Sequence, residues 1–284
     1  MTAQQCGAIA HEVLGDDGEV RVIAVFERSI YVAAPRGIVC IGAAIGEGPI
    51  NVEVARLPAG GWSDVGIATG TEGTASGRML TLERMRLDVS AAAIWLPPPV
   101  PNFTPVTLRA GLAAMQAVKP PVDGLARLVI SRTPASTSVE RAASGPIDAL
   151  RRELPSVLAS GTWSPDTIRA AILLTGLGPG LTPSGDDLLG GIMLALSATG
   201  HDGLRDALWA FLEPELDALT VPISAMHLSA AADGMGSLAL HVLRDSILAG
   251  DVSGEAIADV AVIGHTSGWD AAAGIVLGLT AALP

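Results

Sequence analysis

Residues 176–196 read GLGPGLTPSGDDLLGGIMLAL, and this stretch decides how the C-terminal half of the chain is organised. Its first ten residues contain four glycines and two prolines, a composition typical of a rigid loop with exposed backbone N–H groups. Asp186 and Asp187 then open an apolar run that is typical of a buried helix. Carboxylates in a first helical turn suit the positive end of the helix dipole. The stretch therefore predicts a loop that leads into a helix.

A second stretch, SGWDAAAGIVLGL at residues 267–279, matches residues 184–196 without a gap. Both stretches follow the pattern S-G-x-D-x-x-x-G-I-x-L-x-L, with seven fixed positions. We interpret them as an internal loop–helix repeat. The glycine four residues after Asp187, and the one four residues after Asp270, allow another helix to approach closely. A quasi-twofold arrangement of the two copies would place both helix N-termini around one cavity.

Further helices are expected on both sides of residues 176–196. Thr104-Pro105 and Ser164-Pro165 each combine an N-cap residue with proline at the first helical position. Gly145-Pro146 predicts a break within one of the longer helical segments. The expected helices cover residues 104–118, 138–158, 164–174, 187–199, 204–219, 223–232, 236–249, 254–262 and 270–282.

The first hundred residues have a different pattern, with short β-branched runs between turn residues. These runs predict strands at Val20–Phe26, Ile30–Ala34, Ile38–Ala43 and Ile50–Arg56, and one or two more within Leu80–Val89. The proline-rich residues 97–101 then separate this part from the helical part. We expect an α+β chain, with a β-rich domain over residues 1–100 that forms a small antiparallel barrel or sandwich, and a helical domain over residues 101–284.

Composition excludes several classes of function. The formal net charge of −12 over 284 residues argues against nucleic acid and anionic membranes as partners. The N-terminal residues have no signal-peptide pattern, and the longest apolar runs are too short to span a bilayer. Cys6 and Cys40 have neither metal-like spacing nor a disulfide pattern. We therefore expect a soluble cytoplasmic protein with reduced thiols, and we predict no cofactor and no metal site.

The glycine-rich loop is the strongest candidate for a binding site. Loops of this composition before a helix N-terminus bind phosphate or carboxylate through backbone N–H groups. The loop is not a P-loop, because no lysine follows its glycines. Asp186 and Asp187 allow two interpretations: they hold Mg²⁺, or one caps the helix while the other orients a ligand. Ordinary helix capping is the competing explanation for both copies of the pattern.

Two further positions have both a functional and a structural interpretation. His265 is a candidate for proton transfer, or a hydrogen-bonded polar residue beside a glycine turn. Ser224 lines the same cavity, or caps a helix. His227 and His241 lie in helical patterns without partners at zinc-ligand spacing, so no zinc site is expected.

The predicted site is therefore a small-anion site on loops at helix N-termini. We predict His265 and Asp187 as its catalytic residues. The predicted ligand-binding residues are Gly178, Gly180, Thr182, Ser184, Gly185, Asp186, Ser224, Thr266, Ser267, Gly268 and Asp270.

Two segments, GLGPGLTPSGDDLLGG at 176–191 and GHTSGWDAAAG at 264–274, resemble the AllH-like family, which is associated with the oxamate carbamoyltransferase of bacterial allantoin degradation. Thr220 and Ser224 lie in a T-x-x-x-S pattern that is also similar to this family. The resemblance implies a likeness over most of the chain. It also implies participation, with several different subunits, in phosphorolysis of oxalurate to oxamate and carbamoyl phosphate, or in the reverse transfer. It implies no catalytic residues of its own.

Three functions remain open from the sequence. The first is a carbamoyltransferase subunit that binds carbamoyl phosphate, phosphate, oxamate or a similar anion. The second is a Mg²⁺-dependent small-molecule phosphotransferase, in which Asp186 or Asp187 holds the metal. The third is a non-catalytic assembly or ligand-sensing subunit.

Overall fold

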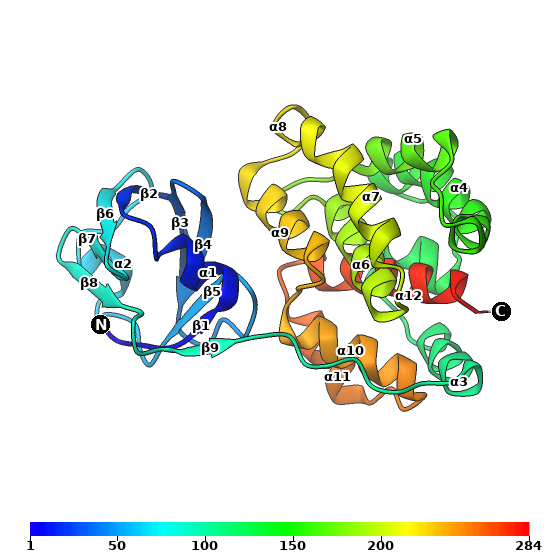
Figure 1. Ribbon diagram of the computed structural model, residues 1–284, viewed down its shortest axis with the longest axis horizontal. Coiled ribbons are helices and arrows are strands. Elements are labelled where there is room, and N and C mark those ends of the chain that lie inside the picture. The colour runs from blue at the N-terminus through cyan, green and yellow to red at the C-terminus, as the bar shows by residue number, and fades with distance from the viewer. Residues whose placement is uncertain (284) are drawn as a thin grey trace. The chain divides into compact units, whose positions relative to one another are not determined.

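The computed structural model describes residues 1–283, and the chain forms two compact units (Figure 1). One unit is Met1–Pro98, and the other begins at Pro99. Each unit has its own hydrophobic core: buried side chains between Ala3 and Val89 form the first, and those between Leu108 and Ala281 form the second. The predicted α+β order, a β-rich N-terminal part followed by a helical C-terminal part, is confirmed.

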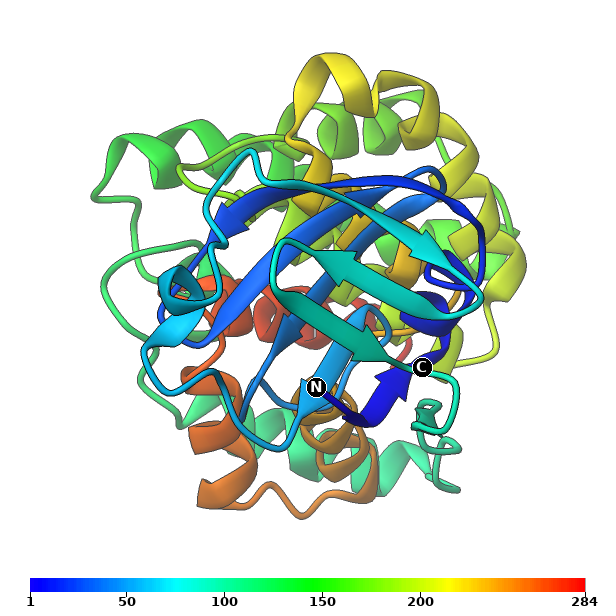
Figure 2. The same ribbon diagram turned by 90° about the vertical axis from the view of Figure 1, so that its left-hand side faces the viewer.

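The N-terminal unit is one curled sheet of nine strands in the order β8-β7-β6-β2-β3-β4-β5-β1-β9 (Figure 2). A bridge between Thr2 and Asp88 joins the start of the chain to β8, so the sheet curls into a half-barrel. The strands are β1 (Ala3–Gly7), β2 (Gly18–Val25), β3 (Ser29–Ala34), β4 (Gly37–Gly42), β5 (Asn51–Val54), β6 (Glu72–Ser76), β7 (Met79–Leu82), β8 (Met85–Asp88) and β9 (Ala93–Trp95), with two short helices, α1 (Ala8–Val13) and α2 (Gly61–Asp64).

The expectation of a small antiparallel barrel or sandwich is wrong in its details. The nine strands form a single mixed sheet, in which β4 pairs with β5 and β1 pairs with β9 in parallel. Because β4 and β5 run in the same direction, the segment between them leads the chain back to the end of the sheet at which β4 begins. The Glu53 carboxylate holds this segment by accepting hydrogen bonds from the backbone N–H groups of Ala44 and Ile45. Alternation of apolar residues predicts strands, but it does not encode which strands become neighbours.

The helical unit contains the loops that the sequence singles out. Its helices are α3 (Pro105–Gln116), the π-helix η1 (Arg127–Ser131), α4 (Ser138–Ser160), α5 (Pro165–Leu174), α6 (Ser184–Ala198), α7 (Asp202–Leu212), the 3-10 helix η2 (Glu213–Glu215), α8 (Leu216–Leu219), α9 (Pro222–Ala232), α10 (Leu238–Ala249), α11 (Gly254–Ala261) and α12 (Ser267–Ala281). No helix of the described residues is long and apolar enough to cross a bilayer.

Two expectations about helix continuity are wrong. No break occurs at Gly145-Pro146, because α4 continues through Pro146 and Pro155. A capping box at Thr137 and a buried apolar face on α4 stabilise this helix against the hydrogen bonds that its prolines cannot form. Conversely, the helix expected over residues 204–219 is divided into α7, η2 and α8, where Pro214 lies in the short 3-10 turn.

The helices α6 and α12 are in very close contact. A Cβ atom added to Gly191 would lie 2.0 Å from the Ala271 carbonyl oxygen, and one added to Gly274 would lie 2.0 Å from the Leu188 carbonyl oxygen. Only glycine leaves space for a neighbouring backbone at such distances. These are the glycines four residues after Asp187 and Asp270, so the expected close approach of a second helix at both positions is present.

Candidate functional site

The loop before α6 has a backbone that requires glycine. Gly176 and Gly178 have φ angles of 72° and 127°, in a region that side chains disfavour. A Cβ atom on Gly176 would also lie 1.8 Å from the Leu219 carbonyl oxygen. The loop composition therefore reflects both turn geometry and close packing.

This loop also presents unpaired backbone donors. Among the described residues, the N–H groups of Gly178, Gly180, Leu181 and Thr182 donate no hydrogen bond to another protein group. They precede the N-terminus of α6, where the helix dipole adds partial positive charge. An anion at this position would meet several backbone donors.

Asp186 is a structural centre of this part of the unit. Its buried carboxylate accepts hydrogen bonds from the Gly176 N–H at 2.7 Å, from the Ser224 hydroxyl at 2.6 Å and from the Thr220 hydroxyl. Burial raises the pKa of Asp186, and these three donors oppose the shift. Asp186 and Ser224 therefore lie together. They hold the loop before α6 against the start of α9.

Asp187 and Asp270 form a pair of electrostatically coupled carboxylates. Burial raises the pKa of Asp187 well above its usual value, the neighbouring Asp270 raises it further, and hydrogen bonding from Ser267 opposes the shift. Burial also raises the pKa of Asp270 to about 6, against hydrogen bonds from Leu125, Ser184 and Thr266. Each carboxylate has a buried Oδ2 atom without a hydrogen-bond partner among the described residues.

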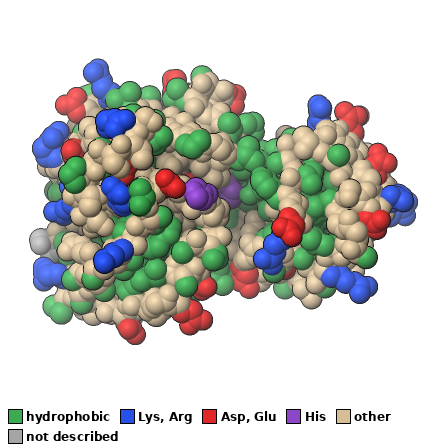
Figure 3. Space-filling model, turned by 180° about the vertical axis from the view of Figure 1, so that it is seen from behind, with side chains coloured by type: hydrophobic (Ala, Val, Ile, Leu, Met, Phe, Trp, Pro, Cys, Tyr) green, Lys and Arg blue, Asp and Glu red, His purple; other side chains and the backbone are tan. Residues whose placement is uncertain are grey.

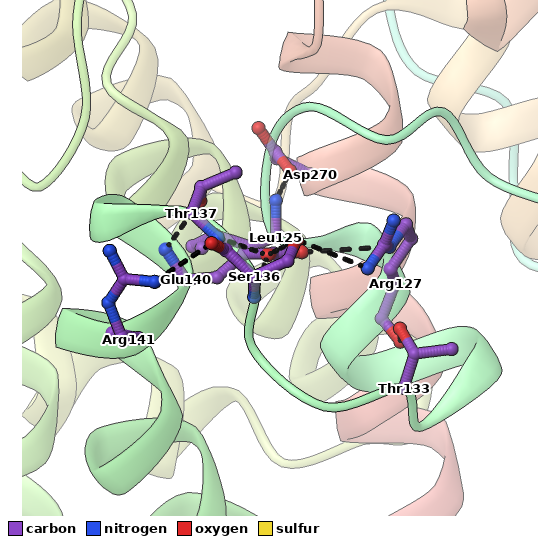
Figure 4. Close-up of polar contacts among 8 residues, drawn as sticks. All are labelled: Leu125, Arg127, Thr133, Ser136, Thr137, Glu140, Arg141 and Asp270. Carbon is purple, nitrogen blue, oxygen red and sulfur yellow. Dashed lines mark hydrogen bonds and ion pairs between the residues drawn. The ribbon is translucent and has the colours of Figure 1, made fainter.

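The Oδ1 atom of Asp270 binds a segment that the sequence analysis did not include in the site. It accepts a hydrogen bond from the Leu125 N–H at 2.5 Å (Figure 4). Gly124, with a φ of 84°, passes so close that a Cβ atom would lie 2.6 Å from the same oxygen. The only local signal was this glycine, because residues 124 and 270 are distant in sequence. Asp270 thus fixes the start of the segment that leads into η1.

The two loops of the proposed repeat meet directly. The Thr182 hydroxyl lies 2.7 Å from the Ser267 hydroxyl, in hydrogen-bond distance. Ser267 is also a donor for Asp187, and Ser184 is a donor for Asp270, so each serine serves the aspartate of the other segment. The N-termini of α6 and α12 are therefore neighbours.

The remaining predicted residues lie on or near the second loop. Thr266 is the N-cap residue of α12 and hydrogen-bonds to Asp270. Gly268 packs so closely that a Cβ atom would lie 2.0 Å from the Val260 carbonyl oxygen, and Gly185 is similarly close to the Leu174 carbonyl oxygen at 1.9 Å. Gly268 and Gly185 thus contribute packing rather than an open backbone surface.

His265 lies at the surface beside this loop. Its side chain is 85% exposed, and its Nε2 atom is 3.2 Å from the Asp123 carboxylate. This geometry gives the imidazole an orienting partner and free access to solvent, which is compatible with proton transfer at the edge of a site.

The charged groups of the site are acidic. Among residues 1–283, no Lys or Arg forms an ion pair with Asp186, Asp187 or Asp270. Within the same residues, no group of three or more His, Cys, Asp and Glu side chains is placed to hold a metal ion. The site thus offers backbone donors for an anion, and carboxylate oxygens for a hydrogen-bond donor such as an amide.

The fold and the site define an α+β protein whose helical unit joins two glycine-containing loop-to-helix junctions through buried aspartates. Residues 174–279 match the family model described as oxamate carbamoyltransferase subunit AllH. The family resemblance is therefore confirmed for this segment, which runs from the end of α5 into α12. The match does not include the N-terminal sheet. The resemblance of the two sequence segments to this family had implied a likeness over most of the chain.

No curated protein and no solved structure matches the chain in the corresponding comparisons.

Proposed function

We propose that this chain is a subunit of an oxamate carbamoyltransferase of allantoin degradation, and that it binds substrate where the N-termini of α6 and α12 meet. The observation that carries the proposal is the position of Asp187. Its unpartnered carboxylate oxygen belongs to the first turn of α6, directly after a loop with unpaired N–H groups. The family match over residues 174–279 covers both loops.

The chemistry of the proposed substrates fits this combination of groups. Oxamate, oxalurate and carbamoyl phosphate each carry an anionic end and an amide NH₂ group. The backbone N–H groups near Gly178, Gly180 and Thr182 would bind the carboxylate or phosphate. Asp187 would accept a hydrogen bond from the amide NH₂ group. One carboxylate and several amide donors would thereby orient both ends of a small ligand.

The remaining residues have supporting roles in this proposal. The hydroxyls of Ser184, Thr266 and Ser267 would add hydrogen bonds to the ligand or to Asp187 and Asp270. Asp186 with Ser224, and Asp270 with Leu125, would keep the loops in place. Such supporting hydrogen bonds hold the binding groups in a productive geometry.

The transfer step needs one proton movement. In phosphorolysis of oxalurate, a phosphate oxygen attacks the terminal carbamoyl carbon, the bond from that carbon to the oxamate nitrogen breaks, and this nitrogen takes up a proton. Protonated His265, oriented by Asp123, would donate that proton. Backbone N–H groups would stabilise charge on the reacting oxygens. Because no Lys or Arg among residues 1–283 forms an ion pair with these aspartates, we propose that partner subunits supply the cationic groups of the site.

Calorimetric titration with carbamoyl phosphate and with oxamate tests the proposal. We expect saturable binding to the wild type, at least tenfold weaker binding to Asp187→Asn, and unchanged binding to Asp166→Asn. Asp166 is the matched control because it is an exposed carboxylate in the first turn of α5. Equal affinity of the wild type and Asp187→Asn would contradict the proposed role of Asp187.

The same titration distinguishes the other functions. ATP with Mg²⁺ is the second titrant, and its saturable binding in place of carbamoyl phosphate would favour a phosphotransferase. If the chain alone binds neither ligand, the titration is repeated with the partner subunits present. Failure of that assembled complex to bind carbamoyl phosphate would rule out the proposed function.

A further inference from the structure

The N-terminal unit contains a cavity that the proposed function does not use. Its volume is about 750 Å³, a size suited to a small molecule. It lies along the seam of the half-barrel, where β5 and the start of the chain face β8. The lining residues are Met1, Thr2, Val54, Ala55, Arg56, Leu57, Pro58, Ala59, Val65, Arg84, Met85 and Arg86.

Three arginines meet at this cavity, and no acidic side chain lines it. Arg56 follows β5, Arg84 precedes β8, and Arg86 lies within β8. None of the three forms an ion pair among residues 1–283, and the one hydrogen bond of their guanidinium groups joins Arg84 to the backbone oxygen of Asp64. Their positive charges are therefore not neutralised within the described structure.

This local charge contrasts with the charge of the whole chain. The net charge is −12, and acidic and basic side chains are interspersed over the face drawn in Figure 3. A cleft with charges of one sign and apolar walls concentrates the electrostatic field and attracts ions of the opposite sign. Guanidinium groups are also suited to paired hydrogen bonds with carboxylate and phosphate groups.

The rest of the lining limits the kind of anion. Val54, Leu57, Val65 and Met85 give the cavity apolar walls. Inorganic phosphate would leave these walls exposed to water, whereas an organic ligand with a carbon skeleton would cover them. Three arginines favour a ligand with more than one negative charge.

We propose that the seam of the N-terminal half-barrel is a second ligand site, which binds a small organic anion with two or more negative charges through Arg56, Arg84 and Arg86. The ligand belongs to the polycarboxylates or the phosphate esters, which share this chemistry. The site is independent of the helix N-termini in the helical unit, because all of its lining residues belong to the first 98 residues.

Calorimetric titration of the full chain with citrate and with fructose 1,6-bisphosphate tests the proposal for the two sources. We expect saturable binding of at least one probe, weaker at 200 mM than at 20 mM salt. The double variant Arg56→Gln/Arg86→Gln should bind at least tenfold more weakly. Arg28→Gln is the matched control, since it removes an exposed arginine of the same unit outside the cavity, and its affinity should stay within twofold of the wild type.

Three results would overturn the proposal. The first is that neither probe binds to the wild type. The second is that the double variant binds a probe as tightly as the wild type does, and the third is that Arg28→Gln loses as much affinity as the double variant. Inorganic phosphate that binds as tightly as both organic probes would show that the apolar walls play no part. Melting temperatures establish that the variants are folded, and the single variants Arg56→Gln and Arg86→Gln replace the double variant if it is not.

Discussion

At the scale of single residues, three aspartates of the same loop cluster have three different environments. Both oxygens of Asp186 accept hydrogen bonds. Asp187 and Asp270 each keep a buried Oδ2 atom without a partner, but Asp270 also accepts a backbone hydrogen bond from Leu125, whereas the hydrogen bond to Asp187 comes from the Ser267 side chain. A buried carboxylate without full hydrogen bonding lowers stability when it is ionised. Asp187 is therefore retained at a cost in stability, a property common among residues that bind ligands.

Replacing Asp187 with asparagine should make the protein more stable at neutral pH. Because the pKa of Asp187 is raised in the folded state, the favourable protonated form is present at low pH, and stability is lost as pH rises from about 4 through the folded pKa. Asparagine does not ionise. The free energy of unfolding of Asp187→Asn should therefore be higher than that of the wild type by about 1 kcal/mol or more at pH 7, and the two should differ little near pH 4. Urea unfolding at both pH values measures this. An identical difference at the two pH values would refute the explanation.

Glu140 is a buried carboxylate with the opposite behaviour. Burial raises its pKa, but hydrogen bonds from Ser136 and Thr137 and the Arg127 guanidinium outweigh burial, so the pKa lies below its usual value (Figure 4). Its contribution to stability is therefore present at neutral pH and is lost as pH falls through the lowered pKa.

Glu140→Gln should destabilise the helical unit by about 1–3 kcal/mol at pH 7, because it leaves the Arg127 guanidinium without its charged partner. Glu153→Gln is the control on the same helix, since Glu153 pairs with Arg152 at the surface and should contribute less than about 0.5 kcal/mol. Chemical denaturation measures both variants. Similar effects of the two substitutions would show that the buried network adds no stability.

At the scale of helices, the contact between α6 and α12 joins the site to the core. The two helices approach through Gly191 and Gly274, and their first turns carry the coupled aspartates. A shift of one helix along the other would therefore move Asp187 relative to Asp270.

Two adjacent glycines of α6 allow a matched test of this contact. Gly191→Ala should destabilise the protein by about 1–3 kcal/mol, because its Cβ atom would overlap the Ala271 carbonyl oxygen. Gly190→Ala should be neutral or stabilising by up to about 1 kcal/mol, since alanine favours helix and the nearest atom to its Cβ is 3.6 Å away. Thermal unfolding compares the two. Equal melting temperatures would exclude tight packing at Gly191.

At the scale of the whole molecule, the two units have separate hydrophobic cores. The proline-rich segment from Pro97 to Pro101 lies at their boundary and has no helix or strand. Units with separate cores and a short linker commonly unfold as separate cooperative transitions.

Calorimetry of the full chain should therefore record two unfolding transitions. Gly191→Ala should lower the melting temperature of one transition only, the one that belongs to the helical unit. Citrate or fructose 1,6-bisphosphate should raise the melting temperature of the transition that belongs to the N-terminal unit, because a ligand stabilises the state that binds it. A single transition that Gly191→Ala shifts as a whole would contradict independent unfolding.

Local sequence patterns predicted the features that depend on near neighbours along the chain. Proline and hydroxyl caps predicted α3 and α5, apolar periodicity predicted most helices, and β-branched runs predicted β2 to β5. The S-G-x-D pattern predicted two of the helices and the glycines that allow close contact, although α6 and α12 begin at Ser184 and Ser267, three residues before the predicted starts at 187 and 270. These features are local because caps, turns and periodicity involve residues only a few positions apart.

Which distant residues become neighbours depends instead on how the whole chain packs. The parallel pairs of the sheet, the bond from Leu125 to Asp270, and the contact of Thr182 with Ser267 each join segments that no local pattern relates. The gathering of Arg56, Arg84 and Arg86 at one seam has the same origin, because the curl of the sheet brings β8 to the start of the chain. Packing of distant apolar faces selects these contacts, and a single sequence does not specify that selection residue by residue.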